Sequence, residues 1–169
     1  MNLEKYQQYS RIARGLEEAE LVLKDARIVN VFTEEIIRGD IAIQDGIIAG
    51  IGSFHGKEER DLAGKYVCPG FIDSHLHLES TLVTPAELVT VASRHGTTTF
   101  IVDPHESANV SGLAGIDYIL EQTEAVKANV YVMMPSYVPA TSIDDNGCTL
   151  TAADMAPYLI TAAFWGLER

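Results

Sequence analysis

The order of apolar and polar residues divides the chain into three regions. Residues 1–16 repeat apolar side chains at steps of three and four, which predicts an amphipathic helix. Residues 17–65 consist of short segments rich in Ile and Val, separated by turn-forming residues. One of these turns is Asp45-Gly46, a favoured two-residue hairpin sequence. The second region therefore predicts a small antiparallel β-sheet. Its expected strands are residues 21–32, 35–43 and 47–51.

Residues 66–169 alternate apolar strands with amphipathic helices. Thr84-Pro85-Ala86-Glu87 offers a capping residue, a proline at the first helical position and a glutamate at the third, so a helix begins there. The expected elements are an extended segment at 66–78, helices at 85–96, 113–127 and 152–159, and strands at 97–102, 129–134 and 162–167. This alternation favours a parallel sheet with helical crossovers.

Composition and charge narrow the classes of function. The 169 residues include 12 Lys+Arg and 24 Asp+Glu, a formal net charge of −12, which disfavours a nucleic-acid partner. No apolar run is long enough to cross a membrane, and the first 15 residues lack the apolar core of a signal peptide. Cys68 and Cys148 form no CxxC motif, so neither a disulfide framework nor a zinc cluster is implied, and we expect reduced thiols. We therefore expect a cytoplasmic protein without a nucleic-acid or membrane partner.

The first candidate site lies in Pro-Gly-Phe-Ile-Asp-Ser-His-Leu-His-Leu-Glu-Ser, residues 69–80. Because side chains alternate along a strand, Asp73, His75, His77 and Glu79 are expected on one face. Four titratable groups beside an apolar run are costly unless something pairs them, and a divalent metal would do so. Imidazole suits Zn, Fe or Mn, and carboxylates favour the harder ions. The alternative is a solvated edge strand with two surface histidines, but the added carboxylates and the Pro-Gly turn favour metal.

A second candidate, Asp103-Pro104-His105-Glu106, begins where the next expected strand ends. Active sites of parallel α/β folds lie at the carboxyl ends of the strands. Asp103, His105 and Glu106 are therefore expected at the site as ligands, supporting groups or substrate contacts. The alternative is a polar turn that caps the following helix.

A third candidate is Glu168, which follows the last expected strand and could place a carboxylate at the same edge. The alternative is a charged residue near the C-terminus, and position alone favours that alternative.

These motifs resemble a known family. Residues 69–77 are similar to the first-strand signature of the amidohydrolase superfamily, metal-dependent hydrolases built on a (β/α)8 barrel. The finer resemblance is to bacterial adenine deaminases. It rests on His-Leu-His-Leu-Glu-Ser (75–80), His-Gly-Thr-Thr-Thr (95–99) and Asp-Pro-His-Glu-Ser-Ala-Asn-Val (103–110), with residues 23–32 and 39–43 similar to that family's N-terminal sheet.

The resemblance implies an α/β fold: the first half of a metal-dependent hydrolase (β/α)8 barrel, preceded by a small antiparallel β domain. The expected domains are an N-terminal helix at 1–16, the β domain at 17–65 and a partial barrel at 66–169. A complete barrel takes about 250 residues, so we expect truncation after about the fourth strand.

The resemblance also implies a reaction, the hydrolysis of adenine to hypoxanthine and ammonia in adenine catabolism and purine salvage. The family's site is binuclear, with Mn or Fe expected rather than Zn. His75 and His77 would ligate the first ion, Glu168 would bridge both ions, and Asp73 and Glu79 would support the ligands. The general base and further histidine ligands are expected in later barrel strands.

Two alternatives to this activity stay open. One is another amidohydrolase that acts on a cyclic amide or an acetylated amino sugar. The other is a non-catalytic fragment that binds metal or pairs with a complementary chain. Adenine is the expected small-molecule partner, and a homo-oligomer is a further expectation.

Overall fold

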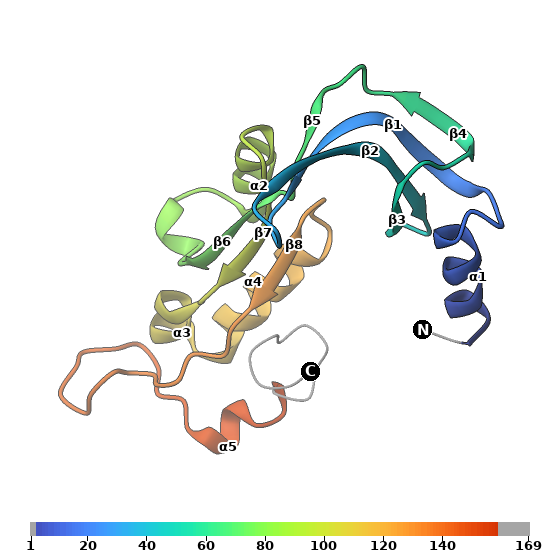
Figure 1. Cartoon of the computed structure of the whole chain (residues 1–169). Helices are drawn as coiled ribbons and strands as arrows, with labels where there is room; N and C mark the ends of the chain where they lie inside the picture. Colours follow the sequence, from blue (N-terminus) through green and yellow to red (C-terminus); the bar gives the residue numbers. More distant parts are fainter. Residues whose placement is uncertain (1–2, 159–169) are drawn as a thin grey trace. The chain divides into compact units, whose positions relative to one another are not determined.

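The computed structural model describes residues 3–158, and contacts within the chain define two units, Met1–Pro69 and Gly70–Arg169. The first contains α1 (Leu3–Ala13), β1 (Ala19–Asn30), β2 (Glu35–Gln44), β3 (Ile47–Gly52), β4 (Gly56–Asp61) and β5 (Tyr66–Val67). The second contains β6 (Phe71–Leu76), the 3-10 helix η1 (Glu79–Thr81), α2 (Pro85–Arg94), β7 (Thr97–Val102), α3 (His105–Ser111), α4 (Leu113–Glu124), β8 (Asn129–Val132) and α5 (Ala152–Met155) (Figure 1).

The sheet of the first unit has the order β3-β2-β1-β4, and β5 also pairs with β1. β1, β2 and β3 are antiparallel, as predicted, and the β2–β3 turn has positive φ at both Asp45 and Gly46. The complete sheet is mixed, because β4 and β5, which were not predicted as part of it, pair with β1 in parallel. β4 has the charged sequence GKEERD and is largely exposed, so its residues do not alternate between apolar and polar. Charged side chains are common on edge strands such as this one.

α1 is shorter than the predicted helix and ends at Ala13. Gly15 then adopts a positive φ of 69°, which turns the chain away from the helix axis. Ile12 is the helical residue buried in the core of this unit, against Val22 and Phe54. Leu16, which the periodicity placed on the apolar stripe, is 63% exposed.

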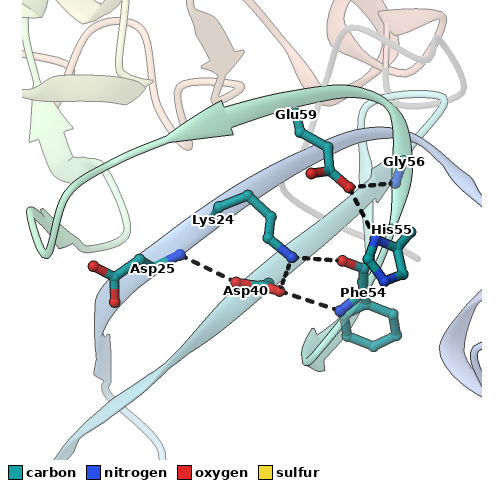
Figure 2. A network of polar contacts seen from close by, with 7 residues as sticks. All are labelled: Lys24, Asp25, Asp40, Phe54, His55, Gly56 and Glu59. Atoms are coloured by element: carbon teal, nitrogen blue, oxygen red, sulfur yellow. Dashed lines mark hydrogen bonds and ion pairs between the residues drawn. The ribbon is translucent and has the colours of Figure 1, made fainter.

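A buried carboxylate stabilises an irregularity in β1 (Figure 2). The register of β1 with β2 shifts between residues 23 and 26, and Asp25 has a φ of 50°. Its N–H donates to Asp40 Oδ1 at 3.1 Å, and Phe54 N–H donates to Asp40 Oδ2 at 3.2 Å. Lys24 Nζ lies 2.5 Å from the same Oδ2 and 2.7 Å from the Phe54 carbonyl oxygen. Asp40, at 8% exposed, therefore satisfies a backbone amide that the bulge removes from the ladder.

The second unit is a parallel sheet of order β6-β7-β8 with helices at its crossovers, as the alternation predicted (Figure 1). α2 begins where expected, with Thr84 Oγ1 accepting a hydrogen bond from Glu87 N–H at 3.5 Å. The core is formed by sheet and helix side chains, among them Phe100, Val102, Val132, Val89, Ile116 and Ile119.

Several predicted boundaries change in this unit. The extended segment 66–78 is two strands of different sheets, because 68–70 interrupts the pairing. Residues 105–111 form the helix α3, which was not predicted, and α5 ends at Met155 instead of 159. The strand predicted at 162–167 lies outside the described residues. Within 3–158 the three parallel strands form an open sheet, and a closed barrel is not present there. The helices of this part of the chain are too short or too polar to cross a membrane.

Candidate metal centre

The candidate site lies at the carboxyl ends of β6 and β7. His75 is the penultimate residue of β6, and His77 follows the strand directly. The parallel pairing of Leu76 with Val102 brings Asp103 beside them, and Asp103 N–H donates to the Leu76 carbonyl oxygen at 2.9 Å. Two motifs 26 residues apart in the sequence are thus neighbours at one edge of the sheet.

His75, His77 and Asp103 place ligand atoms within 4.8 Å of one another. The two imidazole Nε2 atoms are 3.2 Å apart, with the rings inclined at 76°. Two nitrogens bound to one ion at about 2.0–2.1 Å would be about 2.9 Å apart at a right angle and about 3.4 Å apart at a tetrahedral angle. The observed separation falls between these values, so the pair fits a divalent cation.

The Asp103 carboxylate supports the same interpretation. Its Oδ1 atom is buried and accepts no hydrogen bond from the described residues. A buried carboxylate oxygen without a partner is costly, and a bound cation would remove that cost. Two imidazoles and one carboxylate are a donor set common to Zn, Fe and Mn sites.

His77 contacts different groups through its two ring nitrogens. Nε2 faces His75, whereas Nδ1 lies 2.9 Å from Glu106 Oε2 and 3.0 Å from the Asp103 carbonyl oxygen. Because both neighbours of Nδ1 are acceptors, the hydrogen-bond network assigns the ring proton to Nδ1.

Glu79 is not on the strand face where the alternation placed it. The strand ends at Leu76, and Glu79 begins the 3-10 helix η1. Its Oε1 accepts a hydrogen bond from Ser107 N–H at 2.9 Å, and its Oε2 is buried without a partner among the described residues. Burial, together with the neighbouring Glu106 carboxylate, raises the pKa of Glu79 above its usual range.

Glu106 shows the opposite shift. Burial acts to raise its pKa, but its own backbone N–H, the neighbouring carboxyl group of Glu79, and the nearby His77 and His105 hold the pKa below its usual range. Ser80 Oγ donates to Glu106 Oε1 at 3.4 Å. The two carboxylates open on a hollow of about 380 Å³, which is lined by Glu79, Ser80, Glu106, Ser107, Val110 and Ser111.

Among the described residues, Asp73 and His105 are not part of the candidate ligand group. Asp73 Oδ1 accepts a hydrogen bond from His75 N–H at 3.3 Å, so it contacts the backbone of a candidate ligand. His105 begins α3, and its ring packs edge-on against Tyr137, with centroids 4.8 Å apart. Glu168 lies outside the described residues.

Two residues at the site were not singled out from the sequence. Ser80 stands within the first motif, next to Glu79, and a hydroxyl that reaches the second motif has no sequence signature. Tyr137 follows β8, and its only signal is its place after the end of a parallel strand.

The fold and the site define an α/β protein with a candidate divalent-metal centre at the carboxyl edge of its parallel sheet. Residues 66–162 match the model of the Amidohydrolase family, which is more than half of the chain. The chain belongs to this family.

Two relatives with high identity are both described as adenine deaminases. The chain is 59% identical over 153 residues to the adenine deaminase of Desulfitobacterium hafniense (strain Y51), covering 90% of this chain and 27% of that protein. It is 51% identical over 155 residues to the adenine deaminase of Clostridium acetobutylicum, covering 92% of this chain and 27% of that protein. The chain thus spans 27% of the length of these curated relatives.

Solved structures share the fold at lower identity. L-hydantoinase (dihydropyrimidinase) from Arthrobacter aurescens has a TM-score of 0.54 at 22% identity, covering 69% of this chain and 28% of that one. N-acyl-D-glutamate deacylase from Bordetella bronchiseptica has a TM-score of 0.56 at 21% identity, covering 83% and 34%. These likenesses support an amidohydrolase-like fold for the described residues.

Proposed function

We propose that this chain is the N-terminal portion of an adenine deaminase and contributes the first metal ligands of its active site. The reaction is the hydrolysis of adenine to hypoxanthine and ammonia, a step of adenine catabolism and purine salvage. The observation that carries this proposal is the 59% identity, over 90% of the chain, to a protein described as an adenine deaminase. The cluster of His75, His77 and Asp103 gives that identity a chemical basis.

In this proposal His75 and His77 hold a divalent cation through their Nε2 atoms, and Asp103 contributes a negative charge beside them. The resemblance to adenine deaminases implies two ions per complete site, and the carboxylates beside the imidazoles favour Mn or Fe. When bound, such ions act as Lewis acids and lower the pKa of a water molecule, so that hydroxide is available near neutral pH. The residues of this chain orient the ligand nitrogens and neutralise part of the charge.

The complete site needs groups that residues 3–158 do not supply. Only three histidines, His75, His77 and His105, lie at the carboxyl edge of the sheet among the described residues, and His105 packs on Tyr137. We propose that Glu168 is the bridging carboxylate, and that the other ligands and the general base come from polypeptide corresponding to the rest of the relatives' length. A complementary chain or a homo-oligomer stays a prediction.

An activity assay tests the proposal. The full chain is freed of metal, loaded with Mn or Fe, and supplied with adenine while ammonia and hypoxanthine are measured. A second reaction adds a polypeptide that covers the remaining length of the Desulfitobacterium relative. We expect turnover in the second reaction, and we expect His77→Ala to abolish it.

The substrate panel includes a hydantoin and an N-acetylated amino sugar. Turnover of either in place of adenine would support the other amidohydrolase activities. If no combination of chain, metal and added polypeptide releases ammonia from adenine, the proposed function is wrong.

A further inference from the structure

We propose that Glu106 is a positioning residue of the metal site, which holds the His77 ring with its Nε2 atom turned toward the cation. This role rests on the metal site proposed above, but it concerns a contact between two motifs of this chain. Asp-Pro-His-Glu follows the end of β7, and from there Glu106 reaches His77, which directly follows β6.

The contacts at His77 Nδ1 support this role. Glu106 Oε2 lies 2.9 Å from Nδ1, and the Asp103 carbonyl oxygen lies 3.0 Å from it. Two acceptors at one nitrogen require that nitrogen to donate, so Nε2 is the atom with a free lone pair. A histidine ligand commonly donates its other ring N–H to a carboxylate or a carbonyl, which sets the tautomer and orients the ring.

The pair alone would hold the ring weakly, because its side chains are 32% and 48% exposed. Exposed pairs contribute little unless other contacts restrain both partners. Here η1 restrains the carboxylate: Ser80 Oγ donates to Glu106 Oε1 at 3.4 Å, and Glu79 Oε1 accepts from the adjacent Ser107 N–H at 2.9 Å. Glu106 is therefore held at both oxygens and through the start of α3.

These contacts form a closed loop between the two motifs. His77 is followed by Glu79 and Ser80, which bind the first turn of α3, and α3 returns Glu106 to His77. A side chain that only stabilised α3 would not need to reach an imidazole nitrogen. Through this contact, the position of α3 instead determines how the ring of His77, a candidate metal ligand, is oriented.

The alternative is that Glu106 is itself a ligand, since His77, Glu79 and Glu106 also place ligand atoms within 4.8 Å of one another. That would require a bare Nδ1 on His77. The Asp103 carbonyl oxygen at 3.0 Å favours a protonated Nδ1 instead. The location of the ring proton therefore separates a positioning role from a ligand role.

The test compares Glu106→Gln and Glu106→Ala with Glu121→Gln, a control that makes the same change on the exposed surface of α4. NMR of the ¹⁵N-histidine-labelled, metal-free full chain at pH 8 locates the ring proton of His77. We expect it on Nδ1 in the wild type, with a downfield proton signal that Glu106→Ala moves upfield and Glu121→Gln leaves unchanged. Calorimetric titration with Mn²⁺ should show affinity lowered about 10–100-fold by Glu106→Ala and less by Glu106→Gln, which keeps a neutral acceptor.

A ring proton on Nε2 in the wild type, or an Nδ1 signal indifferent to Glu106→Ala, would overturn the positioning role. So would Mn²⁺ affinity in Glu106→Ala equal to that of the wild type. Loss of one equivalent of bound Mn²⁺, with the other retained, would make Glu106 a ligand. If the adenine assay fails while the ring-proton and Mn²⁺-affinity results are as expected, only the deaminase proposal is refuted. The ring proton is observed without metal or substrate, so that result does not depend on deaminase activity.

Discussion

Replacing Asp40 tests how the first unit maintains its bulged strand. In Asp40→Ala, the N–H groups of Asp25 and Phe54 lose their acceptor, and Lys24 keeps only the Phe54 carbonyl oxygen. A buried donor left without a partner costs about 1–3 kcal/mol. The Lys24 side chain is 26% exposed and can turn toward water, so the lost ion pair adds only about 1 kcal/mol. With two such donors, we therefore expect a loss of at least about 3 kcal/mol in local stability.

Lys24→Met separates the two contributions of the carboxylate. It removes the ammonium group but leaves both backbone N–H groups bonded to Asp40, so we expect a loss of about 1 kcal/mol. Arg38→Met is the matched control, because it breaks a pair with Asp25 whose side chains are 68% and 41% exposed. We expect the control to resemble the wild type.

Amide hydrogen exchange, read residue by residue by NMR, measures these effects at Asp25 and Phe54. A loss of about 3 kcal/mol corresponds to protection lowered about a hundredfold, against about tenfold or less for Lys24→Met. If Lys24→Met lowers protection as much as Asp40→Ala, the ion pair dominates and the assignment of Asp40 as a backbone acceptor is wrong.

Three further predictions concern the two units separately. Burial alone would raise the pKa of Asp40, but hydrogen bonds from Lys24 and two backbone N–H groups hold it below the usual range. The stabilisation by the ionised carboxylate is therefore complete above about pH 4 and is lost as the pH falls through the lowered pKa. In urea unfolding, the difference in free energy of unfolding between the wild type and Asp40→Asn should become smaller in acid. A difference that does not change with pH would contradict this. A methyl group at Gly70 would overlap the Thr98 side chain, so Gly70→Ala should lower the free energy of unfolding by about 1–3 kcal/mol. In thermal unfolding, adding Thr98→Ala should restore part of this stability. A double variant no more stable than Gly70→Ala would argue against the overlap. Thr84→Ala should lower the stability of the second unit by about 1 kcal/mol, and an unchanged urea midpoint would show that the cap contributes nothing.

Elements with a local signature could be predicted from the sequence. The start of α2 follows from the Thr84 cap, and the β2–β3 turn follows from Asp45-Gly46. The meeting of His75, His77 and Asp103 follows from one topological rule, since parallel neighbouring strands end at the same edge. Sequence reasoning therefore placed these three residues at one edge of the sheet, and their role as metal ligands stays a prediction.

What it missed depends on tertiary context. β4 is a charged edge strand that pairs only because β1 offers it a free edge. Its sequence therefore lacks the alternation of apolar and polar residues that predicts a strand. Glu79 does not lie on the strand face where the alternation predicted it, because β6 ends at Leu76 and the chain then turns into η1. The alternation rule assumes that a strand continues, and it cannot show where pairing stops. That turn is also what brings Glu79 to the N–H of Ser107.

The most direct test of the metal site is calorimetric titration of Mn²⁺ into the metal-free full chain. We expect binding in the wild type that is lost in His75→Ala and in His77→Ala. His55→Ala is the control, because the His55 side chain is 84% exposed and lies in the other unit. Its affinity should match that of the wild type. Binding that survives both substitutions, or that His55→Ala removes equally, would contradict a metal centre at His75, His77 and Asp103.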